Sequence, residues 1–351
     1  METVEIDGGM LEAGGQVLRT SLALSALTGK PLLIRNIRSS RPKAGLRPQH
    51  LAAAKAIASM CSAELKNAAI GSSQIFFKPS AVSETNLGVN IGSAGSISLL
   101  LSQVLPVSLL KETKLRVIGG TNVPFSPPME FLQKSLFPVL HRMGARLEAN
   151  VSSLGYFPKG NGAVSFSSRP ARLPLKPVSL LEFGELEFVR AFSHCASLPK
   201  RVAENQAIAA KHALADLNVE FEEKIACRDN AATVGSGITL FACTSTGAVL
   251  SGSALGSKGL PAEEVGKEAA KNLLKELNAG QACDSHLADQ LIPFMALAGG
   301  KSEICSSCLT SHCVTNIAVV EKFLPVHFSV QGSQGEPARI SVEGACFSRP
   351  K

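Results

Sequence analysis

Large aromatic side chains are scarce in this chain of 351 residues: tryptophan is absent, and Tyr156 is the only tyrosine. This scarcity argues against a single-stranded nucleic-acid site built on large stacking platforms. Phosphate contacts would have to dominate any such site.

Long apolar runs and a signal peptide are missing as well. No stretch is apolar over the length that a bilayer requires, and the amino-terminal METVEIDGG carries acids where a signal peptide carries lysines. We therefore expect an intracellular protein that does not enter a membrane. It would be nuclear in a eukaryote and cytoplasmic in a prokaryote.

A disulfide framework is not indicated either. The nine cysteines are odd in number and irregularly spaced, at positions 61, 195, 227, 243, 283, 305, 308, 313 and 346. In a chain of this length such a pattern predicts reduced thiols.

Positive charge, by contrast, is in excess. The net charge of +7 attracts polyanions, and nucleic acids and nucleotide phosphates are the usual ones inside a cell. Many basic proteins bind no nucleic acid, so the charge favours such a partner without establishing it. The chain is long enough for two globular domains, with 45% hydrophobic and 18% charged residues.

One order of secondary structure recurs three times. Each copy begins with an apolar helix and continues with a strand, a polar loop, a second helix and two strands. The helix pairs start near residues 15 and 48, 96 and 128, and 286 and 312. We infer an α/β (α+β) fold in which three repeated α/β units form a large body, interrupted by a smaller α/β domain. The body would comprise residues 1–180 and 281–351, and the inserted domain residues 181–280.

The first candidate for chemistry is a glycine-rich segment that leads into a helix. Glu12 precedes Gly14 and Gly15, and Arg19 shares a helix face with Gln16. Backbone N–H groups at such a helix start bind anions, and an acid beside them can hold a divalent metal. An ordinary turn with a helix cap explains the same residues.

A basic loop follows, with four cations within ten residues: Arg38, Arg41, Lys43 and Arg47. Arginine makes two-point contacts with phosphate oxygens, and the helix that starts behind the loop at Pro48 adds partial positive charge. A solvated basic loop is the alternative.

His312 is the candidate nucleophile. It opens a predicted helix, and the partial positive charge of a helix amino terminus keeps an imidazole neutral near pH 7. Neutral imidazole can attack phosphorus. A structural cap is one alternative, and a metal site formed by Cys305, Cys308, His312 and Cys313 is another.

Together these segments resemble the RNA 3'-terminal phosphate cyclase family over essentially the whole chain. The matching segments, in order, are residues 12–19, 37–50, 92–96, 119–121, 155–160, 287–291 and 312–316. The resemblance implies the same body of three α/β units with an inserted domain. It also implies a ligase-type nucleotidyl transferase that uses ATP and an RNA bearing a 3'-phosphate.

The resemblance implies that His312 attacks the α-phosphorus of ATP and becomes adenylylated. The adenylate passes to the RNA 3'-phosphate as RNA(3')pp(5')A, and the 2'-hydroxyl displaces AMP to give a 2',3'-cyclic phosphate. The resemblance assigns Glu12, Gln103 and Asp289 to the nucleotide, and Glu12 also to a metal, Mg²⁺ or Mn²⁺. Residues assigned to phosphates are Arg19, Arg38, Arg41 and Gln49.

The sequence departs from the family pattern at several positions. Ala13 replaces a glycine, so the loop is expected to approach phosphate less closely. A glutamine expected near Ser102 stands one residue later, as Gln103, and Asn122 replaces a frequent aspartate. Smaller departures lie at residues 40–45 and 160–162.

Two other functions fit parts of the sequence. Non-catalytic relatives of the cyclases act as ribosome-assembly factors in rRNA processing, but they lack the histidine. Enolpyruvyl-transferase-like enzymes also use repeated α/β units and basic loops, but with a different repeat count and without this insertion.

Overall fold

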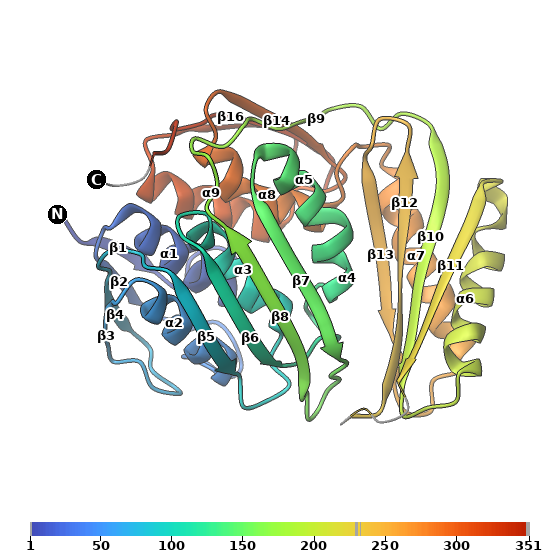
Figure 1. The fold of residues 1–351 in the computed structure, drawn as a ribbon. Helices are drawn as coiled ribbons and strands as arrows, with labels where there is room; N and C mark the ends of the chain where they lie inside the picture. Colours follow the sequence, from blue (N-terminus) through green and yellow to red (C-terminus); the bar gives the residue numbers. More distant parts are fainter. Residues whose placement is uncertain (1, 229–230, 232, 349–351) are drawn as a thin grey trace.

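The computed structural model describes residues 2–228, 231 and 233–348, which form an α/β structure, as the sequence predicted (Figure 1). Two short turns, η1 (Leu132–Leu136, a π-helical turn) and η2 (Ala215–Leu217), accompany the helices. The helices are α1 (Gly15–Thr28), α2 (Pro48–Met60), α3 (Ile97–Ser108), α4 (Met129–Phe131), α5 (Phe137–Met143), α6 (Arg201–Ala213), α7 (Ala262–Asn278), α8 (Ser285–Leu297) and α9 (Ser311–Phe323).

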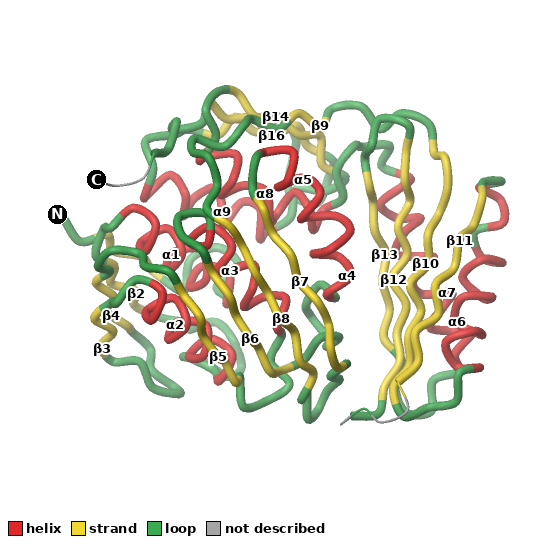
Figure 2. Tube along the Cα trace, viewed as in Figure 1, coloured by secondary structure: helices red, strands yellow, loops and turns green. Residues whose placement is uncertain are grey.

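The described residues form four sheets of four strands each (Figure 2). The first has the order β1 (Val4–Asp7), β2 (Leu32–Arg35), β4 (Ile75–Lys78), β3 (Glu64–Lys66). The second has the order β5 (Thr85–Asn90), β6 (Thr113–Gly119), β8 (Gly162–Arg169), β7 (Arg146–Ser153). The third has the order β11 (Glu220–Arg228), β10 (Leu186–Ala196), β12 (Gly235–Thr244), β13 (Val249–Leu255). The fourth has the order β9 (Ser179–Leu180), β14 (Lys301–Ser306), β16 (Ala338–Glu343), β15 (Phe328–Gln331).

Three of these sheets share one connectivity. The first strand along the chain pairs in parallel with the second. The second pairs antiparallel with the fourth, and the fourth pairs antiparallel with the third, as in β1-β2-β4-β3. The sheet with β9 follows the same rule, although the chain makes β10–β13 between β9 and β14. The sheet that departs from the rule lies inside residues 181–280. The division of the chain into two domains at these boundaries stays a prediction.

Two large hydrophobic clusters lie beneath the sheets, beside a small third one formed by Leu154, Tyr156 and Ala196. The larger draws on residues from Ile6 to Val178 and from Cys283 to Val342, whereas the second uses Val189 to Ala282. Helix α1 packs against α2, α3 and α9, and it is apolar on most sides because neighbours surround it. Helices α6 and α7 cover the sheet with β10–β13.

Helices α1 and α9 are aligned by polar contacts within the core. Asn316 accepts hydrogen bonds from the Gln16 amide (2.9 Å) and from the Thr20 hydroxyl (2.6 Å). These buried groups have to find partners, so they fix the relative positions of the two helices. The alignment brings the amino-terminal turns of both helices, and hence Glu12 and His312, to one place.

The predicted helix pairs of the three repeats are confirmed, but several strands were missed. The predicted repeat begins each copy with a helix, so it lacks the first strand of each of the three similar sheets, β1, β5 and β9, and strand β10 was not predicted either. Strand β5, TNLGVN, is polar and half-exposed, so its residues lack the run of β-branched or aromatic side chains that marks a strand. Such a strand forms because its neighbour β6 supplies the hydrogen bonds.

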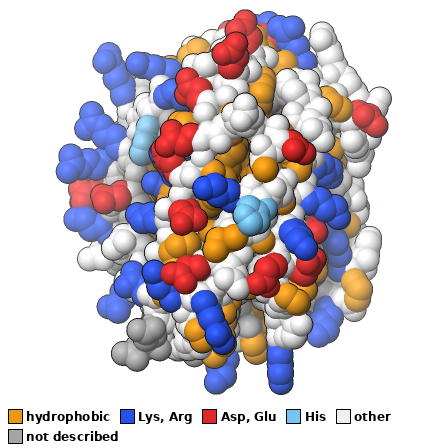
Figure 3. All heavy atoms as spheres, turned by 90° about the vertical axis from the view of Figure 1, so that its right-hand side faces the viewer, with side chains coloured by type: hydrophobic (Ala, Val, Ile, Leu, Met, Phe, Trp, Pro, Cys, Tyr) orange, Lys and Arg blue, Asp and Glu red, His pale blue; other side chains and the backbone are white. Residues whose placement is uncertain are grey.

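No helix in the described part of the chain has both the length and the apolar character needed to cross a bilayer. The face around α6 carries Lys and Arg side chains interspersed with Asp and Glu (Figure 3). The net positive charge is therefore not gathered into one continuous patch on that face.

Candidate active site

A cavity of about 690 Å³ opens where the amino termini of α1, α2, α3 and α9 converge. The amino-terminal caps of three of these helices line it, namely Gly14, Arg47 and Ser96, and His312 lies in the first turn of the fourth. Each helix start carries partial positive charge and unpaired N–H groups, so four of them together favour anions.

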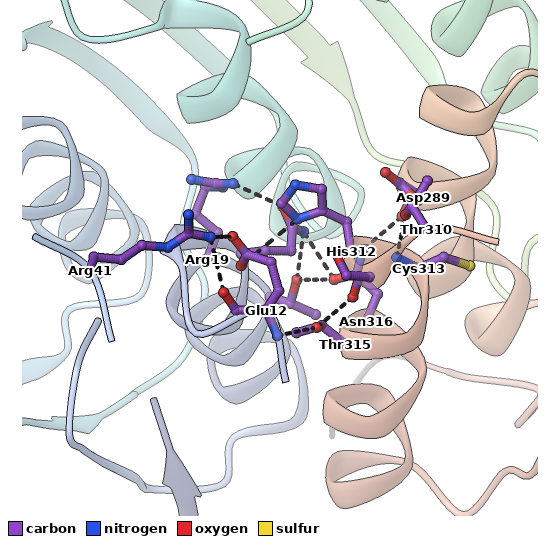
Figure 4. A network of polar contacts seen from close by, with 12 residues as sticks. Glu12, Arg19, Arg41, Asp289, Thr310, His312, Cys313, Thr315 and Asn316 are labelled. Atoms are coloured by element: carbon purple, nitrogen blue, oxygen red, sulfur yellow. Dashed lines mark hydrogen bonds and ion pairs between the residues drawn. The ribbon is translucent and has the colours of Figure 1, made fainter. Parts of the chain in front are cut away.

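His312 lies at the wall of this cavity, beside Glu12 (Figure 4). Its Nδ1 is 3.8 Å from a carboxylate oxygen of Glu12, and both atoms are shielded from water and lack a hydrogen-bond partner. Burial lowers the pKa of His312, Glu12 opposes this change, and Arg19 adds to it. The ring is therefore neutral near pH 7, with burial as the largest cause among its neighbours, and the effect of the helix terminus stays a prediction.

Glu12 lies between His312 and Arg41. The Arg41 guanidinium donates to the Glu12 backbone carbonyl at 2.9 Å and forms an ion pair with its carboxylate. The Glu12 amide donates to Thr315 in α9 at 3.4 Å. These contacts fix Glu12 from both sides.

The glycines after Glu12 make room for the charged groups. A Cβ on Gly14 would lie 2.0 Å from the Glu12 carboxylate, and one on Gly15 would lie 2.6 Å from the Arg19 guanidinium and from the His50 ring. Neither glycine has a positive φ, so space rather than backbone conformation requires them. Ala13, where the family pattern has glycine, adopts φ 51, a strained value for alanine.

Arg19 joins the cavity to the core. Its guanidinium donates to the Gln16 side chain at 2.9 Å, and Gln16 in turn bonds Asn316 of α9. Burial lowers the pKa of Arg19 to about 10, which leaves it charged at neutral pH. Burying a charge without a carboxylate at hydrogen-bond distance costs free energy. A bound phosphate would offset that cost by pairing with the guanidinium.

The basic loop places Arg38 and Arg47 on the same cavity. Arg38 donates to the backbone carbonyls of Lys43 (2.7 Å) and Gly45 (3.3 Å), which holds the loop in shape. Burial and the neighbouring arginines, Arg47 first, lower the pKa of Arg38. Mutual repulsion of this kind is relieved when an anion binds.

Gln49 connects two helix starts at the cavity. Its side-chain oxygen accepts from the Ser96 amide at 3.3 Å, and Ser96 caps α3 by accepting from Leu99. Gln49 therefore joins the start of α2 to the cap of α3 at the cavity.

Asp289 does not line the cavity but acts on the helix that carries His312. It accepts a 2.5 Å hydrogen bond from Thr310, the cap of α9, and Thr310 accepts from the Cys313 amide at 2.9 Å. Burial raises the pKa of Asp289 to about 7. The prediction that Asp289 orients His312 therefore has a physical route through Thr310, and a direct contact with the nucleotide stays a prediction.

Gln103 lies in a small cavity, of about 20 Å³, beside the main one. Asp289 and Arg19 also line it, and both amide atoms of Gln103 are buried without a partner. The structure thus separates Gln103 from the cavity of His312, with Arg19 at the boundary. Ser102, where the family pattern led us to expect the glutamine, has a buried hydroxyl without a partner as well.

A protein cage for a metal is not formed in the part of the chain that the structure describes, where no three His, Cys, Asp or Glu side chains gather suitably. Mg²⁺ keeps several waters and needs only one or two carboxylates beside substrate phosphates. Glu12, with one buried oxygen lacking a partner, fits that requirement.

The alternative zinc site gains no support. Cys305, Cys308 and Cys313 are free thiols, and Cys313 points into the core with no exposed surface. Its amide, not its sulfur, faces the polar groups at the start of α9. No group of metal-binding side chains forms around His312 within the described residues.

Sequence reasoning missed His50 and two phenylalanines of the cavity. His50 is buried, and burial together with Arg19, Arg38 and Arg47 lowers its pKa to about 3, so it is neutral. It accepts from the Arg47 amide at 3.2 Å. The position of His50 at the end of the basic segment was the one feature of the sequence that could have indicated its place at the cavity. Phe125 and Phe157 carried none, because a single phenylalanine in a loop has no pattern.

Known proteins match the chain over nearly its whole length. A family profile described as RNA 3'-terminal phosphate cyclase matches residues 10–330. A protein of Ignicoccus hospitalis named RNA 3'-terminal phosphate cyclase is 42% identical over 354 residues, which cover 99% of this chain and 100% of the relative. Proteins with the same name are 43% identical in Methanopyrus kandleri and 42% identical in Thermococcus kodakarensis, and each match covers 97% of this chain. Those matches cover 99% and 98% of the two relatives.

Proposed function

The chain belongs to the RNA 3'-terminal phosphate cyclase family, and from that membership we propose that it converts an RNA 3'-phosphate into a 2',3'-cyclic phosphate at the expense of ATP. The observation that carries the proposal is the position of His312. It lies neutral at a helix start, on a cavity lined by Glu12 and four arginines.

His312 is the proposed nucleophile toward the α-phosphorus of ATP. Because Nδ1 is turned toward Glu12, a proton on that nitrogen leaves the lone pair on Nε2. Attack by Nε2 forms the N–P bond and breaks the bond from the α-phosphorus to the bridging oxygen, so that pyrophosphate leaves. Glu12 would then stabilise the charge that the ring gains.

The RNA 3'-phosphate is the next nucleophile. One of its oxygens attacks the adenylyl phosphorus, the N–P bond breaks, and RNA(3')pp(5')A forms. The ribose 2'-hydroxyl then attacks the RNA phosphorus, loses its proton, and expels AMP with closure of the ring. Arg19, Arg38 and Arg41, with Gln49, would neutralise the phosphates and hold the reacting groups in line.

Glu12 would also hold the divalent metal, Mg²⁺ or Mn²⁺. When bound, the ion supplies positive charge that draws electrons from the phosphates and favours the leaving group. Its place beside Glu12 is consistent with the unpaired carboxylate oxygen there.

Incubation with ATP labelled on the α-phosphate, followed by a denaturing gel, tests the nucleophile. Wild type should retain acid-labile label, and His312→Ala should retain none. His327→Ala is the matched control, because His327 is exposed and outside the cavity, and it should label like wild type. Absence of label from wild type, with metal present, would instead support a non-catalytic assembly factor.

A further inference from the structure

The main cavity carries two aromatic side chains that its chemistry so far leaves unused. All sixteen phenylalanines of the sequence lie in the described part of the chain, and only Phe125 and Phe157 among them are exposed. Their exposed fractions are 103% and 67%, and both line the cavity of His312. Two exposed phenylalanines at one cavity point to a ligand that stacks on them, although the scarcity of tryptophan and tyrosine argued against a stacking platform.

We propose that Phe125 and Phe157 form a base-stacking platform for the 3'-terminal nucleotides of the RNA. This inference rests on the proposed function, since it takes the RNA to be the polymer whose 3'-phosphate reaches the arginines. Every base has a π face, so stacking holds RNA ends of any sequence, as a phosphate-directed enzyme requires.

Phe125 is held in a conformation that the fold alone does not favour. Its φ is 62, in the left-handed region that bulky side chains rarely adopt. Its ring gains no burial in return, because the whole side chain faces solvent. Strain combined with an exposed aromatic surface is typical of a binding position.

Both phenylalanines come from loops that buried contacts lock together. Asn122, three residues before Phe125, forms a β-bridge with Tyr156, the residue before Phe157. The amides of Thr121 and Asn122 both donate to the carbonyl of Gly155, at 2.9 and 3.2 Å. The platform is therefore pre-organised rather than assembled on binding.

A buried histidine of the neighbouring sheet fixes the same pair of loops. Tyr156 bonds His194 Nδ1 at 2.6 Å, and the Asn122 amide lies 3.1 Å from His194 Nε2. Burial lowers the pKa of His194, which keeps the ring neutral. Strand β10, which carries His194, thus supports the loops on which the platform stands.

The charged surroundings favour RNA over an apolar ligand. The arginines of the cavity bind phosphates, so a nucleotide held there presents its base to the rim. The face around α6 offers no such combination, because acids interrupt its basic groups (Figure 3). ATP also carries a base, and the experiment has to separate the two nucleotides.

Binding of a fluorescent RNA with a 3'-phosphate, measured by anisotropy without ATP, tests the platform independently of catalysis. Phe125→Ala and Phe157→Ala should each bind about 5- to 100-fold more weakly than wild type, from the usual strength of base stacking on an aromatic ring. Phe125→Tyr should restore binding. Ile208→Ala, an exposed apolar side chain outside the cavity, is the control and should bind like wild type.

An RNA that lacks its two 3'-terminal bases sharpens the test. Wild type should bind it at least as weakly as either single alanine variant binds normal RNA, and the double variant Phe125→Ala/Phe157→Ala should not distinguish the two RNAs. Equal binding of normal RNA by wild type and both alanine variants would overturn the platform. If the alanine variants bind RNA normally but lose labelling by ATP, the platform would instead hold the adenine of ATP. Wild type that binds RNA but never becomes labelled would refute the proposed function and leave the platform standing.

Discussion

The protonation state of His312 depends on its immediate neighbours. Burial lowers its pKa, Glu12 raises it, and Arg19 lowers it, so the charges around the ring act in opposite directions. The ordinary pKa of histidine is 6.5, and burial holds the pKa of His312 below that value. The group is thus charged only in acid, below its ordinary range.

We predict that self-adenylylation rises with pH through a midpoint below 6.5 and is level above it. The sign follows because only the neutral ring is a nucleophile, and it is protonated below the folded pKa. Single-turnover labelling at saturating ATP measures the profile. A midpoint at or above 6.5 would contradict the environment described for the ring.

Gly15 should tolerate no side chain. Gly15→Ala would push aside Arg19 and His50, and displacement of a phosphate-binding group by about 1 Å costs on the order of 100-fold in rate. We expect adenylylation to fall by at least about 10-fold. Gly88→Ala is the matched control, because a Cβ there meets no atom within 4 Å. Equal rates for the two variants would show that Arg19 does not need its present position.

Helix α9 is held in place by its cap, Thr310, which bonds both Cys313 and Asp289. Thr310→Val keeps the shape of the side chain and removes both hydrogen bonds. The free energy of unfolding should therefore fall by about 1–3 kcal/mol. Adenylylation should fall too, since His312 lies two residues further on. Thr310→Ser retains the hydroxyl and should stay close to wild type in both measurements. Thermal unfolding and labelling rates check this, and a normal rate in the valine variant would show that the cap does not position His312.

Much of the fold could be predicted at the level of elements. Helix starts at Gly15, Pro48 and Ser311 are marked locally by glycine, proline or a capping threonine, so they were placed within a residue or two. Strands such as β5 and β10 were not predicted, because their pairing depends on distant partners. The exposure of Phe125 is likewise a property of the assembled loops.

The candidate site shows the same division. Motifs in the sequence indicated Glu12, the arginines and His312, and the structure places them on one cavity. The separate position of Gln103 and the indirect action of Asp289 depend on how α3 and α8 pack, which local sequence does not reveal.

At the scale of the whole molecule, Asp284 ties the two hydrophobic clusters together. It caps α8 by accepting from Leu287 at 2.7 Å and accepts from the amide and hydroxyl of Ser251 in β13 at 2.9 and 2.7 Å. The carboxyl is buried, and burial raises its pKa to about 6. Asp284 thus links the sheet of β10–β13 to the helix that precedes β14.

Asp284→Ala should lower the free energy of unfolding by about 2–4 kcal/mol, since three donors lose their acceptor. Because the folded pKa of Asp284 is raised above the ordinary 3.8, its stabilising effect is lost as pH rises through about 6. The loss on substitution should therefore be larger at pH 5 than at pH 8. Urea unfolding measures it, with Asp216→Ala as an exposed control that should change stability by less than about 0.5 kcal/mol. A loss that grows with pH would contradict this assignment.

The proposed mechanism depends most on the covalent bond between His312 and AMP. Peptide mass spectrometry after reaction with ATP, under neutral to alkaline conditions that preserve a phosphoramidate, locates it directly. We predict one AMP adduct, on the peptide with His312, that disappears when RNA with a 3'-phosphate is added after ATP has been removed. An adduct on any other residue, or an adduct that persists in the presence of this RNA, would contradict the mechanism.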